Sequence, residues 1–176
     1  MDRLQCHRLR RDFLRCAASL VCVAALSSAS QARLGETAQA CVDRYGQPIE
    51  VVRDVPGIPC SMVFLIPGPQ FSNKRVRCFF DAAEPTAVCK SIVYNNFGQE
   101  LEVMESILQL NSEGSTWLQP KRTPNVSLGI TNYDWQREDG ATAKNHGDGL
   151  WIWGKEDTQK RRDGKQQELK DRVKGL

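Results

Sequence analysis

Apolar residues along the chain switch between the spacing of a helix and the alternation of a strand. The first helical stretch has one apolar face, made by Ala38, Cys41, Val42 and Tyr45. Thr37 precedes it as a capping residue, and Gly46 followed by Pro48 ends it. The pattern predicts a short helix with sharp ends, whose cysteine lies on the buried side and serves packing or a disulfide rather than catalysis.

Strand signals follow this helix. Residues 62–66 form a continuous apolar run, and residues 74–81 and 86–94 alternate between apolar and polar. The turn-forming residues 82–85 join the two alternating stretches, which predicts a β-hairpin. Two prolines and a glycine in residues 53–60 indicate a connecting loop.

The second part of the chain returns to the same order of elements. Residues 99–110 have helical spacing, with acidic residues early in the segment. Residues 116–124 contain two prolines and are interpreted as a loop. Residues 126–136, 141–144 and 149–154 then predict three more strands, separated by turns that contain glycine and aspartate.

This order of elements favours an α+β fold, with helices packed on an antiparallel sheet, over a doubly wound fold. The two halves share a helix-then-three-strands plan, although no sequence repeat can be aligned between them. Residues 33–154 form the single α+β domain in this interpretation. Residues 155–176 form a charge-dense C-terminal helix with eight basic and five acidic side chains, a composition typical of a solvated helix.

Residues 1–32 have the organisation of a secretory signal peptide. Five arginines lie in the first part, an apolar run follows over residues 17–26, and small residues end the segment. The run is too short to cross a bilayer as a helix. Arg10-Arg11 followed by Phe13-Leu14 resembles a twin-arginine export motif, and an arginine-rich ordinary secretory signal is the alternative. We expect a bacterial protein that is periplasmic or secreted.

Removal of this segment changes the charge balance. The whole chain has 24 basic and 21 acidic residues, of which five and two precede residue 33, so the remainder is balanced at 19 of each. A domain without net charge has no broad field to attract nucleic acid or anionic lipid. We therefore expect no nucleic-acid partner. No stretch after residue 32 is long and apolar enough to cross a bilayer as a helix, so we also expect no transmembrane segment.

Four cysteines follow residue 32, namely Cys41, Cys60, Cys78 and Cys89. An even number in an exported domain favours disulfides, and the lack of a C-x-x-C pair makes a zinc site the weaker alternative. Cys78 and Cys89 fall opposite each other in the predicted hairpin if Ala83 and Glu84 centre its turn. That register predicts a Cys78–Cys89 disulfide and leaves Cys41 to pair with Cys60.

The opening helix matches the spacing of a known family at Gly35, Thr37, Cys41, Tyr45, Gly46 and Pro48. This spacing resembles the first helix of BamE/SmpA-type outer-membrane assembly lipoproteins and is similar to domains built like the β-lactamase inhibitor protein. The whole chain also resembles exported bacterial proteins that open with such a helix. The lipoproteins are acylated on a cysteine directly after their signal run, whereas here that segment ends in Ala32-Arg33. The resemblance implies helices on an antiparallel sheet and envelope-assembly support without a lipid anchor, and it transfers no site residue.

One histidine, His146, follows residue 32. A hydrolase would pair it with Asp148 and a nucleophile such as Ser127, whereas the Asn, Gly and Asp around it are also ordinary turn formers. Nucleophile elbows, phosphate-binding loops and dinucleotide fingerprints are absent from the sequence. No catalytic residue, metal ligand set or cofactor is therefore predicted.

All four tryptophans lie between residues 117 and 153. Trp151 and Trp153 share one strand face because side chains alternate, and with Trp135 they would form an aromatic surface for a sugar or peptide. The alternative is that these rings fill the core of the second half. We expect a non-enzymatic, exported binding or envelope-assembly support module with a protein or glycan partner in the cell envelope. A small cell-wall or glycan-directed hydrolase is the alternative.

Overall fold

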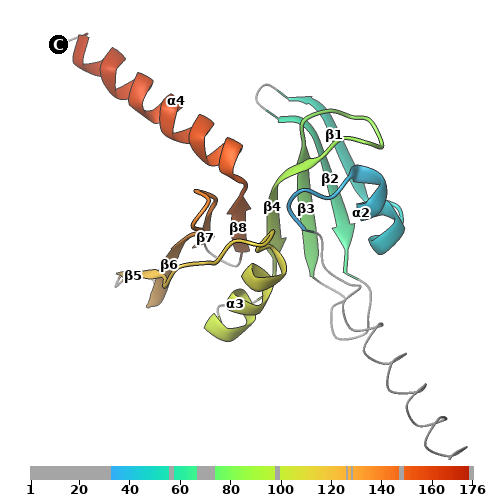
Figure 1. Cartoon of the computed structure of the whole chain (residues 1–176), viewed down its shortest axis with the longest axis horizontal. Helices are drawn as coiled ribbons and strands as arrows, with labels where there is room; N and C mark the ends of the chain where they lie inside the picture. The colour runs from blue at the N-terminus through green and yellow to red at the C-terminus, as the bar shows by residue number, and fades with distance from the viewer. Residues whose placement is uncertain are drawn as a thin grey trace, which may run out of the picture. The chain divides into compact units, whose positions relative to one another are not determined.

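The computed structural model describes residues 33–55, 58–66, 74–97, 100–125, 127, 129–146 and 149–174. The expected signal peptide, residues 1–32, lies outside these residues, and so does Asp148. Eight strands form one antiparallel sheet in the order β1-β2-β3-β4-β8-β7-β6-β5, accompanied by helices (Figure 1). The expected α+β class with an antiparallel sheet is therefore confirmed.

The sheet consists of two four-stranded meanders. The first contains β1 (Glu50–Val55), β2 (Ile58–Leu65), β3 (Arg75–Phe80) and β4 (Cys89–Asn95). The second contains β5 (Lys121–Asn125), β6 (Ile130–Gln136), β7 (Thr142–His146) and β8 (Gly149–Trp153). The last strand of each meander, β4 and β8, pair antiparallel at the centre of the sheet.

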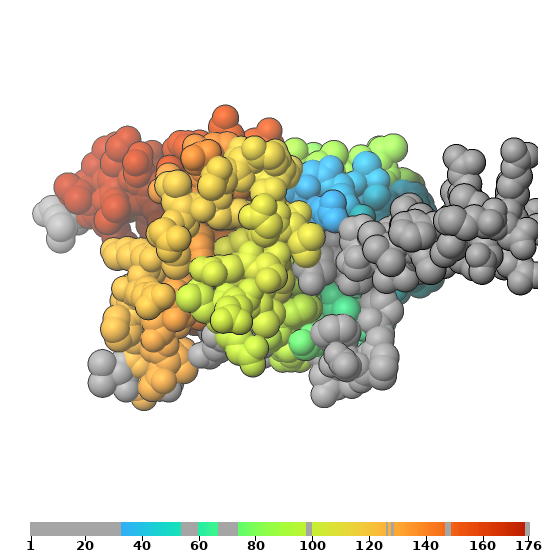
Figure 2. Space-filling model, turned by 60° about the horizontal axis from the view of Figure 1, so that its bottom comes forward, coloured from blue at the N-terminus to red at the C-terminus, as the bar shows by residue number. Residues whose placement is uncertain are grey.

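Two helices precede the meanders and pack on one face of the sheet, α2 (Ala38–Tyr45) before β1 and α3 (Leu101–Leu110) before β5. The predicted ends of α2 are confirmed, because Thr37 Oγ1 accepts the Ala40 N–H and Gly46 follows the helix at a φ of 83°. In the space-filling view α3 lies between strands of the second meander and the segment that contains α2 (Figure 2).

The core lies between this helix pair and the sheet. The buried residues of both helices contribute to it, namely Ala38, Cys41, Tyr45, Met104, Ile107 and Leu108. The sheet contributes Phe64, Val76, Ile92, Tyr94, Leu150 and Ile152. The rings of Tyr45 and Phe64 lie 5.5 Å apart, which joins α2 to β2. Helices α2 and α3 thereby cover one face of the sheet and leave its opposite face free of both.

Two strands were missed by the sequence prediction. Within the expected loop over residues 53–60, residues 53–55 belong to β1 and residues 58–60 to β2, and the two strands pair with Val55 opposite Ile58. The expected loop over residues 116–124 contains most of β5. Each helix is thus followed by four strands instead of three. Both β1 and β5 are sheet edges, and an edge strand needs little apolar patterning and tolerates proline, here Pro124.

All four cysteines described are free and buried, so neither expected disulfide is present in this structure. The β3–β4 register sets Cys78 opposite Ile92 and Phe80 opposite Cys89, with an irregularity next to Phe80. The expected register was wrong because the connection between these strands is longer than the assumed turn. The Cys78 thiol nevertheless interacts with the thiols of both Cys41 and Cys89, and burial raises its pKa.

Helix α4 (Lys155–Lys174) begins directly after β8 and projects away from the sheet (Figure 1). Among its described residues, only Thr158 is buried. The Thr158 N–H bonds the Gly154 carbonyl, and its hydroxyl lies 2.9 Å from that of Thr142 on β7. Leu169 and Val173, further along the helix, are 61% and 69% exposed. Thr158 therefore attaches the start of α4 to the sheet, and the helix is solvated towards its C-terminal end.

Candidate binding surface

The face of the sheet opposite α2 and α3, called the open face below, carries the strongest candidate for a binding surface. Trp151 and Trp153 of β8 lie on it, because the alternating residues Leu150 and Ile152 belong to the core. In the β4–β8 ladder, Trp153 is opposite Ser91 and Trp151 is opposite Val93. These residues from β4 and β8 place the tryptophan pair near the middle of the sheet.

Trp135 does not join this pair. Trp135 is opposite Ala143, and Ala143 is opposite Ile152, so its side chain shares the core face. Trp135 is 3% exposed and stacks on Tyr133 with 5.6 Å between ring centroids. The structure therefore separates Trp135 from Trp151 and Trp153, and for Trp135 the core interpretation holds. A register offset of one residue moves a side chain to the other face, and the sequence does not state that offset.

The remaining tryptophans are held in a defined arrangement. The rings of Trp151 and Trp153 stack with 5.9 Å between centroids and 22° between planes. From α4, the guanidinium of Arg161 lies 4.2 Å from the centroid of the Trp153 ring. Both tryptophans are half-buried. The cation–π contact adds to the hydrogen bonds of Thr158 and fixes the second turn of α4 against the open face.

A groove of about 500 Å³ lies between α4 and the strands of the second meander, and it is called the α4 groove below. Its cationic lining residues are Lys121, Lys144, Arg161, Arg162 and Lys165. Asp134 is the one acid in this lining, and its carboxylate lies 3.3 Å from Lys144 Nζ. Trp153 borders the groove, and Trp135 reaches it with little exposed surface. The α4 groove is therefore cationic, with one aromatic wall.

A second hollow, of about 540 Å³, is also bordered by Trp153 and includes Phe79, Trp151 and Lys90. Here the charges are mixed, because Lys90 Nζ lies 3.2 Å from Glu156 and 3.7 Å from Asp81. Burial by itself would lower the pKa of Lys90, but the hydrogen bond and charge of Glu156, with Asp81, outweigh it and raise this pKa. Lys90 is thus a charged anchor between β4 and the start of α4.

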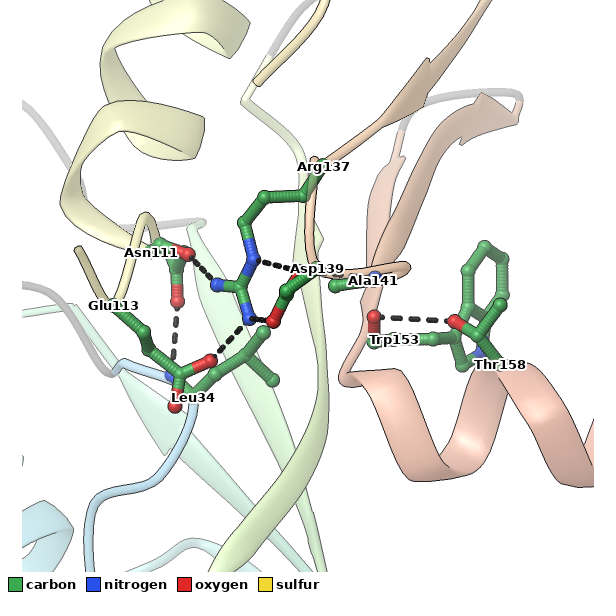
Figure 3. Close-up of polar contacts among 8 residues, drawn as sticks. All are labelled: Leu34, Asn111, Glu113, Arg137, Asp139, Ala141, Trp153 and Thr158. Carbon is green, nitrogen blue, oxygen red and sulfur yellow. Dashed lines mark hydrogen bonds and ion pairs between the residues drawn. The ribbon is translucent and has the colours of Figure 1, made fainter. Parts of the chain in front are cut away.

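Arg137, directly after β6, is the buried cation that sequence inspection missed. It donates to both carboxylate oxygens of Asp139 at 2.8 Å, and to Glu113 and the Asn111 carbonyl at 2.5 Å (Figure 3). Burial alone would lower the pKa of Arg137, and the hydrogen bonds with Asp139 and Glu113 raise it instead. Its contacts are internal, so this cluster joins loops rather than offering a site. In the sequence, Arg137 differs in no way from a surface arginine.

Asn111, the residue after α3, completes this polar cluster. Its Oδ1 accepts the Leu34 N–H at 3.0 Å (Figure 3). Its Nδ2 donates to the Tyr94 hydroxyl and the Ile107 carbonyl. The side chain is fully buried. Asn111 thereby connects the segment before α2, the end of α3 and β4, because each of its polar atoms has a partner on a different element.

The residues of the alternative hydrolase are not assembled in the described part of the chain. His146 is exposed at the end of β7, opposite Gly149, and Ser127 is exposed between β5 and β6. No hydrogen bond recorded among the described residues joins the two. Within the same residues, no three His, Cys, Asp or Glu side chains are placed to hold a metal ion. No described helix combines the length and apolar character needed to cross a bilayer.

Comparison with known proteins finds no relative of this chain. The chain matches no protein-family model, no curated protein and no solved structure. The candidate surface is therefore defined by its geometry alone. It consists of a stacked tryptophan pair, an arginine against one of the rings, and two flanking hollows.

Proposed function

We propose that this chain is a non-enzymatic binding module, exported to the cell envelope, whose open face receives a protein or glycan partner. The observation that carries the proposal is the stacked pair of Trp151 and Trp153 on a sheet face that α2 and α3 leave uncovered. An antiparallel sheet covered on one face usually presents polar side chains on the other. The open face departs from that pattern around the pair, because Val93 opposite Trp151 is buried and Phe79 lies beside the tryptophans, and a partner that covers this apolar area supplies a reason.

The neighbours of the pair support the same proposal. Tryptophan and arginine are the residue types most often found to dominate binding energy at interfaces. Arg161 lies against Trp153, and hollows of about 500 and 540 Å³ both border that ring. A partner that covers Trp153 can therefore place groups in both hollows, which gives the contact shape as well as apolar area.

Two further features of the sequence enter this proposal. Export is supported by the signal-like organisation of residues 1–32, and the envelope-assembly role by the resemblance of the opening helix. We also propose that the domain is built from two related halves. The order of a helix followed by a four-stranded meander, once with α2 and once with α3, supports that view. The charged helix α4 extends the binding surface beyond the second half.

The binding proposal is tested by photo-crosslinking in cells that make the full chain. One variant carries p-benzoylphenylalanine in place of Phe79, which borders the hollow beside Trp151. A matched variant carries it in place of Gln109, which is exposed on α3. We expect a discrete crosslinked product from position 79 and none from position 109. The same product should fall at least about fivefold when Trp151 and Trp153 are both changed to Ala, because those rings supply most of the interface energy.

Other outcomes would contradict the proposal. Equal products from positions 79 and 109 would indicate contact without a preferred face. A product at position 79 that survives the double tryptophan substitution would remove the aromatic pair from the interface. Circular dichroism of each purified variant checks that the fold is retained.

Export is tested separately with residues 1–32 fused to a reporter. We expect the fusion to leave the bacterial cytoplasm and to be retained when Arg10 and Arg11 are both changed to Lys. Export that ignores this change but stops when the general secretory ATPase is inhibited would leave the ordinary secretory signal as the explanation.

A further inference from the structure

The α4 groove permits an inference that rests on the proposed function and names the chemistry of its partner. We propose that this groove binds a carboxylate-rich segment of a partner protein. The groove lies between α4 and the second meander, and Trp153 with Arg161 forms the wall that it shares with the open face. A partner seated on the tryptophan pair would therefore continue into the groove.

The lining of the groove has a local excess of positive charge. Five cationic side chains and one acidic side chain line the groove, and the acid, Asp134, already forms an ion pair with Lys144. No ion pair within the described residues involves Lys121, Arg162 or Lys165. These three cations face water, and clustering them costs repulsion that an anionic partner would relieve.

The acidic residues of α4 lie outside the groove lining, and most of them have partners on their own helix or on β4. Asp163 and Asp171 each accept a hydrogen bond from a glutamine one turn earlier, at 2.8 Å. Glu168 pairs with Arg172 at 2.6 Å. None of these acids lines the groove. The helix therefore presents Arg161, Arg162 and Lys165 to the groove and none of its carboxylates, although residues 33–176 as a whole have equal numbers of acids and bases.

The surroundings of Trp153 favour a protein over a glycan or a nucleic acid as the partner. A sugar or base that stacks on tryptophan needs access to a ring face. The Trp153 ring already has Trp151 and the Arg161 guanidinium against it. Leu118, which also lines the groove, is 46% exposed and offers apolar contact. A peptide segment supplies both carboxylates for the cations and aliphatic side chains for Leu118, whereas a polyanion without side chains supplies only charge.

The test measures binding of a short fluorescent glutamate-rich peptide to the full chain, with its glutamine counterpart as the uncharged control peptide. The groove variant combines Arg162→Gln with Lys165→Gln. The matched control combines Lys170→Gln with Lys174→Gln, on the same helix and with the same loss of two charges but outside the groove lining. We expect the groove variant to lose affinity at least about tenfold, since charge-assisted contacts are removed, and the control to keep it.

Three results would overturn the inference. The wild-type chain could fail to bind the glutamate peptide, or both variants could lose affinity equally, which would indicate unspecific charge attraction. Heparin or single-stranded DNA could displace the peptide at a far lower concentration of charge, which would assign the groove to another polyanion. All variants remain usable, because the four side chains changed are exposed.

The crosslink at position 79 separates failure of this inference from failure of the proposed function. If the chain with p-benzoylphenylalanine at position 79 crosslinks equally well with and without the two groove substitutions, and no variant binds the glutamate peptide, the open face binds a partner and the groove plays no part. If the glutamate peptide binds in the groove and no partner crosslinks at position 79, the open-face proposal fails on its own.

Discussion

The guanidinium of Arg137 and the carboxylate of Asp139 meet through two hydrogen bonds of 2.8 Å, one from Nε and one from Nη2. The Arg137 side chain is 2% exposed and that of Asp139 is 30% exposed. Asp139 also accepts the Ala141 N–H, so the pair closes the turn between β6 and β7. This is a buried cation whose neutralisation depends on one near carboxylate and on Glu113.

The first prediction is that Asp139→Asn lowers the free energy of unfolding by about 3 kcal/mol, because it leaves the Arg137 cation buried without its main counter-charge. Urea denaturation measures the change. Asp134→Asn is the matched control, since its exposed pair with Lys144 should contribute less than about 1 kcal/mol. Equal effects of the two substitutions would show that Arg137 does not need Asp139.

The second prediction concerns pH. The hydrogen bond from Arg137 holds the pKa of Asp139 below its ordinary value of 3.8, against the opposing effect of partial burial. A folded-state pKa that is lowered means that the pair stabilises the fold fully above the unfolded-state value and loses this effect as pH falls through the folded-state value. The stability difference between the wild-type chain and Asp139→Asn should therefore be constant near neutral pH and shrink below about pH 4. A difference that does not change down to about pH 2 would contradict this assignment.

The third prediction concerns the thiols. Burial raises the pKa of Cys78 and of Cys60, and all four thiols are buried, so alkylation of the native chain should be at least about a hundredfold slower than in urea. Mild oxidation should join Cys78 to Cys41 or to Cys89, because its thiol interacts with both. Peptide mapping identifies the bond. A first product that links Cys41 to Cys60 would contradict the structure and restore the pairing expected from the sequence.

The fourth prediction uses two glycines in opposite settings. Gly164 lies inside α4 with open space where a Cβ would be placed, so Gly164→Ala should stabilise the helix by about 1 kcal/mol and slow amide exchange around it about fivefold. Gly46, at a φ of 83°, also has open space but a backbone that disfavours alanine. Gly46→Ala should therefore destabilise the protein by about 1 kcal/mol. Hydrogen exchange and thermal unfolding measure the two effects, and a shared sign would refute the argument.

Features that depend on interactions between neighbouring residues were predicted from the sequence, and features that depend on contacts between distant segments were not. The start and end of α2 were predicted because the Thr37 cap and the Gly46 stop act within a few residues of the chain. The edge strands β1 and β5 were missed because an edge strand carries weak apolar alternation, and their partners lie on other segments. The tryptophan pair of the candidate surface, Trp151 and Trp153, was predicted from the alternation of side chains within one strand.

Arg137 could not be found in this way. A buried arginine becomes tolerable only when carboxylates and carbonyls from several loops surround it, here Glu113, Asp139 and Asn111. The α4 groove has the same origin. Lys121 and Lys165 are far apart in sequence and line one groove only because α4 attaches to the second meander.

The sequence by itself determined the α+β class, the positions of α2 and α3, the cap and stop of α2, most of the strands, and the charge balance of the chain after residue 32. Those properties follow from local periodicity and from composition. Only the tertiary structure decided the register that sets Cys78 opposite Ile92, the face that receives Trp135, and the surroundings of Arg137. The physical reason is that register, sidedness and ion pairing depend on contacts between segments distant in the chain, where an offset of one residue reverses the face of a side chain while leaving the local pattern unchanged.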